Sequence, residues 1–121
     1  MINSWNSVVS SNDRVFLVGD AFLCKEDRAT EILDRLNGYK VLIAGNHDRS
    51  KKTMLGMGFN EYHRELPYSF GDIGKALMKH YPLPDRVIKE RGYDFLIHGH
   101  LHNPPHTQGL KINVAADIIN F

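Results

Sequence analysis

Short runs of apolar residues alternate with polar segments along most of this chain. Three runs, at residues 14–18, 40–44 and 94–97, are largely unbroken, and a glycine follows each within two residues. Runs of this length that are rich in β-branched and aromatic side chains are typical of strands buried in a sheet. The pattern therefore predicts three buried strands, each ending in a polar segment.

Helical spacing is found between the first two of these strands. Apolar residues recur at intervals of three and four through residues 26–36, which predicts a helix that Asn37-Gly38 ends. Weaker patterns predict helices at 49–57 and 84–91 and the end of an amphipathic helix at 1–9. Further strands are predicted at 61–66, 75–79 and 110–114, with a turn at 71–74 and a loop at 103–109.

Strands and helices alternate early in the chain, and strands dominate later. This order is typical of an α/β layered fold with at least a partly parallel sheet. In open α/β sheets, ligands bind beyond the carboxyl ends of the strands. If the three buried strands are parallel neighbours, the polar segments that follow them meet at one place.

The composition is that of an ordinary globular protein. The 121 residues are 42% hydrophobic and 24% charged, and the formal net charge is +1. The length predicts one domain over residues 1–121. The small net charge gives no strong attraction to nucleic acid or membrane, and the single cysteine, Cys24, excludes an intrachain disulfide. No apolar run approaches the roughly 18 residues of a membrane span, and no secretory signal is visible, so we expect a cytoplasmic protein.

The polar residues after the three strands are of the types that bind metal ions. They are Asp20 after the first strand, Asn46, His47 and Asp48 after the second, and His100 and His102 after the third. Two histidines that are two residues apart point to the same side of an extended segment, so one strand end offers two imidazoles. Imidazole, carboxylate and amide ligands together suit Mn, Fe, Zn or Ni better than calcium.

His80 is a further candidate ligand, because it follows a strand-like run and precedes a loop. The alternative is an ordinary histidine with a structural role, which we favour for His63 and His106, while His98 stays undecided. Residues 45–48 are also compatible with a simple turn that an Asx side chain caps. That account explains one strand end, whereas a shared site explains all three.

Four blocks, in chain order, resemble the calcineurin-like metallophosphoesterase family, and especially its small single-domain bacterial and phage members. The blocks are Gly19-Asp20, Gly45-Asn46-His47-Asp48, Lys79-His80-Tyr81-Pro82 and Gly99-His100-Leu101-His102. The likeness extends over residues 14 to about 117. It implies a β-sandwich flanked by helices, in α-β-β-α layers, and hydrolysis of a phosphate ester at a site of two metal ions.

The resemblance implies a role for each matching ligand. Asp20 matches the carboxylate that bridges two metals, His102 matches a ligand of the first metal, and Asn46, His80 and His100 match ligands of the second. Two divalent cations about 3.5–4 Å apart lower the pKa of a water between them and stabilise the charge that develops on a phosphate.

His47 matches the residue that protonates the leaving oxygen, with Asp48 as its orienting partner. An imidazole that a carboxylate holds can act as a general acid near neutral pH.

One block of the family does not occur in this sequence, namely the Asp-x-His motif of the first strand. The resemblance then implies a truncated fold that lacks its first strand and is incomplete at the N-terminus. The short carboxyl end is a second place where the family fold could be incomplete. Two ligands of the first metal are absent as well, so we expect one or two bound ions. A missing strand exposes the edge of its neighbour, which predicts self-association through that edge.

Three functions are compatible with these observations. The first is a metal-dependent hydrolase of a phosphomonoester or phosphodiester, acting on a phosphorylated small molecule or a nucleotide. The second is a truncated relative, catalytically weak or inactive, that retains one metal site. The third is a nucleic-acid-binding or scaffolding module, which the near-neutral charge and the lack of a basic stripe beyond residues 49–52 disfavour.

Overall fold

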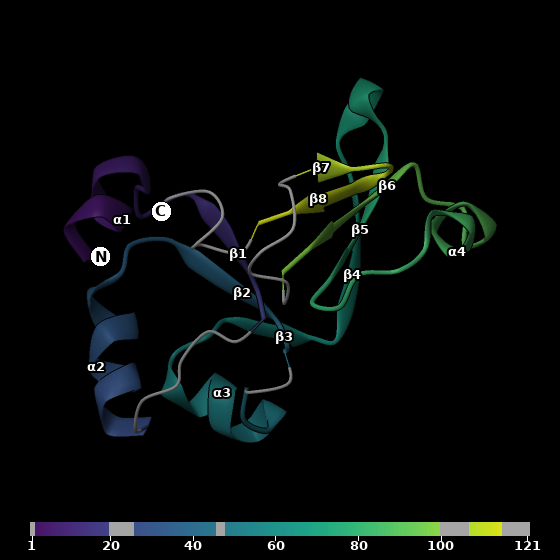
Figure 1. Ribbon diagram of the computed structural model, residues 1–121. Helices are drawn as coiled ribbons and strands as arrows, with labels where there is room; N and C mark the ends of the chain where they lie inside the picture. Colours follow the sequence, from purple (N-terminus) through teal and green to yellow (C-terminus); the bar gives the residue numbers. More distant parts are fainter. Residues whose placement is uncertain (1, 20–25, 46–47, 100–106, 115–121) are drawn as a thin grey trace.

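The computed structural model of the chain describes residues 2–19, 26–45, 48–99 and 107–114 (Figure 1). The elements, in chain order, are α1 (Ile2–Val8), β1 (Arg14–Val18), α2 (Glu26–Arg35), β2 (Tyr39–Ile43), α3 (Lys51–Met57), β3 (Glu61–His63), β4 (Glu65–Ser69), the 3₁₀ turn η1 (Gly71–Ile73), β5 (Lys75–Lys79), α4 (Asp85–Glu90), β6 (Phe95–His98), β7 (Thr107–Gln108) and β8 (Lys111–Asn113).

The described strands form two sheets. The first has the order β1-β2-β3 with parallel pairing throughout. The second has the order β4-β5-β6-β8-β7, in which β5, β6 and β8 are parallel and the outer strands β4 and β7 are antiparallel to their neighbours. Both sheets therefore bring the carboxyl ends of several parallel strands to one edge.

Three apolar clusters define the layers. One joins the first sheet to α1, α2 and α3, around the buried side chains of Trp5, Leu33 and Leu42. The second fills the space between the two sheets, and the third joins the second sheet to α4 through Ile88 and Leu96. Figure 1 shows the same arrangement, with α1 to α3 on one side and α4 on the other. The order of layers is α-β-β-α.

Successive side chains along the central strands pack in different clusters, which shows that both faces of these strands are covered. In β2, Leu42 packs in the cluster under the helices, whereas Val41 and Ile43 pack between the sheets. In β5, Met78 faces the first sheet and Leu77 faces α4. Successive side chains of a strand point to opposite faces, so an unbroken apolar run is needed where both faces are buried.

Most predicted elements are present with bounds within two residues of the expected ones, and the predicted fold class is confirmed. One strand prediction is wrong, because residues 61–66 are not a single strand. β3 ends at His63 and β4 begins at Glu65, and the chain passes from the first sheet to the second at Arg64. Within the predicted loop at 103–109, the structure has the short strand β7, and residues 103–106 lie outside the described part.

The condition that the three buried strands are parallel neighbours is met only for the first two of them. β1 and β2 are parallel neighbours, but β6 lies in the second sheet between β5 and β8. An apolar run shows that a strand is buried, but it does not show which strand is its neighbour. In the described part of the chain, no helix is long and apolar enough to cross a membrane.

Candidate functional site

The carboxyl end of β1, in the first sheet, meets the carboxyl ends of β5 and β6 in the second. Gly19 follows β1, His80 follows β5 and Gly99 follows β6. A Cβ atom at Gly19 would overlap the imidazole ring of His80. A Cβ at Gly99 would lie 2.7 Å from the carbonyl oxygen of Val18 and 3.5 Å from Nδ1 of His80. The His80 ring is thus held against the backbone of two strand ends.

The environment of His80 fixes which ring nitrogen carries the proton. The side chain is buried, with 2% of its residue surface exposed, and Nδ1 lies 3.3 Å from the carbonyl oxygen of Val18. A carbonyl oxygen can only accept, so this contact requires a proton on Nδ1. In the neutral ring the lone pair is then on Nε2, which is the tautomer that can bind a metal through Nε2.

Backbone and ring contacts hold His80 further. The N–H of Gly99 donates to the carbonyl oxygen of His80 at 3.1 Å, which ties the end of β5 to the end of β6. The ring of Tyr81 packs edge-on against the His80 imidazole, with 4.9 Å between ring centroids. These contacts restrict the position of the imidazole from several sides.

The end of β2 lies beside the end of β1. The strand register pairs Val18 with Ile43, the last residues of the two strands. Oδ2 of Asp48 accepts a hydrogen bond from the N–H of Gly45 at 2.8 Å, and the N–H of Asp48 donates to the carbonyl oxygen of Gly45 at 3.3 Å. The carboxylate of Asp48 therefore stabilises the turn after β2.

Of the seven residues predicted for the site, the structure describes His80 and Asp48. The other five, Asp20, Asn46, His47, His100 and His102, lie outside the described residues. Their chain neighbours are informative, because Asp20 directly follows Gly19 and His100 directly follows Gly99. Among the described residues alone, no three His, Cys, Asp or Glu side chains are grouped so that they could hold a metal ion.

His98, undecided from the sequence, is buried in the second sheet with 4% of its surface exposed. Its Nδ1 lies 2.8 Å from the carbonyl oxygen of Gly99, and its register partner on β8 is Asn113, which is also buried. His106 lies outside the described residues.

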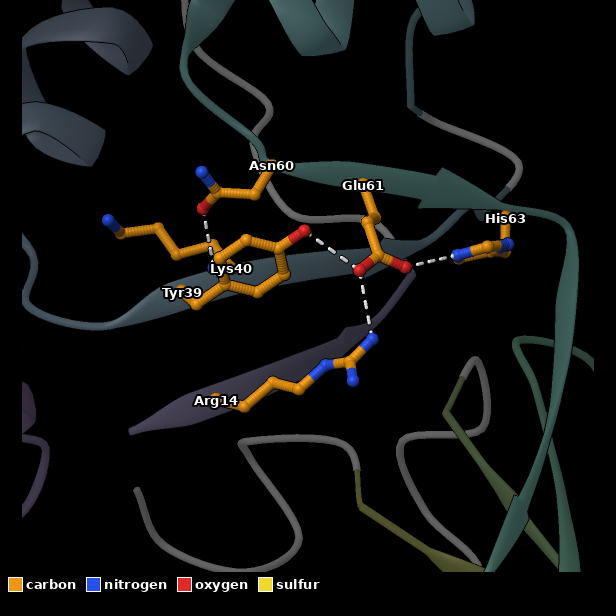
Figure 2. Close-up of polar contacts among 6 residues, drawn as sticks. All are labelled: Arg14, Tyr39, Lys40, Asn60, Glu61 and His63. Atoms are coloured by element: carbon orange, nitrogen blue, oxygen red, sulfur yellow. Dashed lines mark hydrogen bonds and ion pairs between the residues drawn. The ribbon is translucent and has the colours of Figure 1, made fainter. Parts of the chain in front are cut away.

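His63, the last residue of β3 and the register partner of Ile43 on β2, takes part in a polar network on the first sheet (Figure 2). Its Nε2 lies 2.8 Å from a carboxylate oxygen of Glu61, and the other oxygen of Glu61 accepts from Arg14 and from the Tyr39 hydroxyl, each at 2.9 Å. The hydrogen bond with His63 is the largest cause that lowers the pKa of Glu61. The same carboxylate raises the pKa of Tyr39, chiefly through its hydrogen bond with the hydroxyl. The network ties β1, β2 and β3 together, as a structural role for His63 requires.

The sequence did not indicate the backbone contribution to the candidate site. Glycines at 19 and 99 signal a close approach of the backbone, and the structure shows that the group that approaches is the His80 ring. The carbonyl of Val18, which orients that ring, has no signal in the sequence because every residue carries a carbonyl group.

No family model matches this chain. An uncharacterized protein of Methanocaldococcus jannaschii is 32% identical over 133 residues, an alignment that includes all of this chain and 66% of that protein. The chain therefore spans slightly less than two thirds of the length of this relative.

Three solved structures share the fold. A protein of unknown function from Aquifex aeolicus superposes with a TM-score of 0.78 at 22% identity, over 98% of this chain and 75% of that one. A novel archaeal phosphodiesterase has a TM-score of 0.61 at 21% identity, over 94% of this chain and 72% of that one. Vacuolar protein sorting 29 from Cryptosporidium parvum has a TM-score of 0.52 at 16% identity, over 84% of this chain and 56% of that one.

The fold and the meeting of strand ends place this chain among mixed α/β proteins of two sheets with helices outside. A phosphodiesterase is one of the proteins that share this arrangement. At these identities the likeness shows the fold, and function has to be argued from the residues.

Proposed function

We propose that this chain hydrolyses a phosphate ester with the help of divalent metal ions bound at the ends of β1, β2, β5 and β6. The observation that carries the proposal is the placement of His80, a buried imidazole between Gly19 and Gly99 with its Nδ1 3.3 Å from the Val18 carbonyl oxygen. The phosphodiesterase that shares the fold supports the same class of reaction.

The donor set fits a divalent transition metal. His80 offers an Nε2 lone pair, and the ends of β1 and β6 beside it lead into Asp20 and His100, with His102 close behind. The end of β2, which lies beside the end of β1, leads into Asn46. In the proposed site Asp20 would be shared by two ions, Asn46, His80 and His100 would hold one of them, and His102 would contribute to the other. Mn, Fe, Zn and Ni all accept such mixed ligands. Bound ions would supply an activated water and positive charge for the phosphoryl oxygens.

The chain's own residues position the substrate and move a proton. His47 gives its proton to the leaving oxygen, and Asp48 orients the imidazole of His47 from a turn that its carboxylate already stabilises. The substrate class is a phosphomonoester or phosphodiester of a small molecule or a nucleotide. The family resemblance of the four blocks, rather than any contact in the described residues, supports these roles.

Two measurements test the proposal together. Elemental analysis after dialysis against Mn²⁺ gives the number of ions per chain, and hydrolysis of a chromogenic phosphodiester with Mn²⁺ gives the activity. We expect activity to disappear in His47→Ala while the metal content stays the same. His63→Gln is the matched control, because His63 lies in the network of Figure 2, and it should hydrolyse the substrate as the original chain does.

The second candidate function is a chain that binds one metal and catalyses weakly or not at all. It is favoured by the absence of an Asp-x-His motif, which leaves Asp20 and His102 as the matching ligands for the first ion. One ion per chain without hydrolysis would support it. No bound ion, or hydrolysis that His47→Ala leaves intact, would contradict the main proposal.

A further inference from the structure

The proposed reaction does not use the buried imidazole of His98. His98 is the last residue of β6, and 4% of its surface is exposed. Its Nδ1 lies 2.8 Å from the carbonyl oxygen of Gly99, the next residue in the chain. Because a carbonyl oxygen can only accept, Nδ1 carries a proton and donates it. A side chain at the end of the strand thus holds the carbonyl group of the residue that follows the strand.

The backbone of Gly99 is held at other points as well. Its N–H donates to the carbonyl oxygen of His80 at 3.1 Å. A Cβ atom at Gly99 would lie 2.7 Å from the carbonyl oxygen of Val18, so the end of β1 packs closely against this residue. Both backbone polar groups of Gly99 therefore have a partner, and a side chain, that of His98, provides the partner of the carbonyl.

The second sheet in turn fixes the position of His98. The N–H of Val114 donates to the carbonyl oxygen of His98 at 2.8 Å, and the register partner of His98 on β8 is the buried Asn113. An imidazole costs more free energy to bury than an aliphatic side chain does, and hydrogen bonds have to offset that cost. A donor for the Gly99 carbonyl is therefore a contribution that the histidine makes and an aliphatic residue does not.

The carbonyl group that His98 holds belongs to the peptide unit between Gly99 and His100. A peptide unit is planar, so the direction of its C=O bond also sets the direction of its N–H bond. Glycine has no Cβ to limit its backbone angles, so an outside contact is needed to keep this unit in one orientation. His98 provides such a contact immediately before a candidate metal ligand.

We propose that His98 is a positioning residue for metal binding, which holds the peptide between Gly99 and His100 so that the His100 imidazole is presented to the metal ion. The inference rests on the proposed function, because it requires His100 to be a ligand. In this role His98 acts through the backbone and touches neither the metal nor the substrate. Groups that orient metal ligands from behind typically change metal affinity by about 10–100-fold.

Asparagine and glutamine at position 98 separate the hydrogen bond from the burial of a polar side chain. The amide nitrogen of asparagine is the same number of bonds from Cα as Nδ1 of histidine, so His98→Asn keeps a donor for the Gly99 carbonyl. The amide nitrogen of glutamine lies further from Cα, at the level of Nε2, so His98→Gln does not place a donor there. Both variants bury an amide instead of the ring, so they should unfold at similar urea concentrations.

Titration of the metal-free chain with Mn²⁺ tests the effect on metal affinity. The electron paramagnetic resonance signal of free Mn²⁺ gives the Kd. We expect His98→Gln to raise the Kd by about tenfold or more, and His98→Asn to keep it close to that of the original chain. A merely structural role would change the stability of the two variants but would not separate their Kd values. Equal Kd values in both variants and the original chain would overturn the inference while leaving the proposed function in place.

Nuclear magnetic resonance of the metal-free chain tests the peptide unit itself. The ¹³C shift of the Gly99 carbonyl and the ¹⁵N shift of the His100 amide should both move in His98→Gln and stay near their original values in His98→Asn. Unchanged shifts in His98→Gln would overturn the inference. An original chain that binds no Mn²⁺ would overturn the proposed function and this inference together.

The ring of His98 in the original chain keeps the test decisive if His98→Gln fails to fold. Its ring ¹⁵N shifts report which nitrogen carries the proton, and the contact with the Gly99 carbonyl requires a proton on Nδ1. A ring protonated on Nε2 alone would overturn the inference without any variant.

Discussion

The imidazole of His80 occupies the space that a side chain at Gly19 would need. Gly19 has a φ of +80°, and a Cβ atom built on it would overlap three atoms of the His80 ring. The residue after β1 and the residue after β5 are thereby coupled across the two sheets. A change at position 19 should act on His80, which is 61 positions further along the chain.

Gly19→Ala should therefore be more destabilising than an ordinary glycine substitution. The left-handed backbone alone costs about 1–2 kcal/mol for a residue with a Cβ, and displacement of the His80 ring adds about 1–3 kcal/mol of overpacking. Gly92→Ala is the matched control, because Gly92 has a similar φ of +86° and no atom near the position of its Cβ. Urea unfolding of both variants measures the difference.

The same pair of variants also tests the coupling to the proposed metal site. Gly19→Ala should lose bound Mn²⁺ along with stability, whereas Gly92→Ala should keep its metal. If the two variants unfold at the same urea concentration, the contact between position 19 and His80 does not affect the free energy of unfolding.

Asp48 has a structural role that is separable from its proposed catalytic role. Asp48→Asn retains an oxygen that can accept from the Gly45 N–H, so its stability should remain close to that of the original chain. Asp48→Ala loses this acceptor and should cost about 1 kcal/mol. If Asp48 orients His47 through its charge, both variants should hydrolyse the phosphodiester about 10–100-fold more slowly. An Asp48→Asn variant with full activity would show that the charge of Asp48 does not orient His47 and that Asp48 acts by stabilising the turn.

The fold was more predictable from the sequence than the candidate site was. Apolar runs and helical spacing depend on local burial, so β1, β2, β5 and α2 were expected close to their observed bounds. The passage of the chain between sheets at Arg64 was not expected, because pairing depends on distant strands. His80 was a candidate from its place after a strand, but its contact with the Val18 carbonyl joins residues 62 positions apart and has no local signal.

The network around Glu61 predicts a loss of stability in acid. The hydrogen bond with His63, then that with Tyr39, and then the charge of Arg14 hold the pKa of this carboxyl below its ordinary value of 4.5. A carboxyl whose pKa is lower in the folded chain stabilises the fold above its unfolded pKa. That contribution should disappear as the pH falls from about 4.5 through the lower pKa of the folded state.

Thermal unfolding between pH 7 and pH 3 measures this contribution. Glu61→Gln should lower the melting temperature at pH 7, and the difference from the original chain should shrink as the pH falls. Glu31→Gln replaces an exposed carboxyl on α2 and should change the melting temperature little at any pH. Parallel curves for Glu61→Gln and the original chain would show that the charge of Glu61 does not stabilise the fold.

Helix α1 is fastened to the end of α2 by polar contacts as well as by packing. The indole Nε1 of Trp5 donates to the carbonyl oxygen of Asn37 at 2.8 Å, and the side chain of Asn6 contacts the backbone of both Arg35 and Asn37. Trp5 is buried, with 8% of its surface exposed. We expect Trp5→Phe to cost about 1–3 kcal/mol, because it removes the donor and leaves a smaller ring in the same space.

Urea unfolding followed by circular dichroism measures this cost, since the variant has no tryptophan to report by fluorescence. Val8→Ala is the control on the same helix. Val8 is 72% exposed, so the change should stay within about 0.5 kcal/mol. Hydrogen exchange should show the loss first in α1, because the Trp5–Asn37 hydrogen bond is one of the contacts that hold α1 beside the end of α2. A Trp5→Phe variant as stable as Val8→Ala would mean that α1 adds little to the stability of the fold.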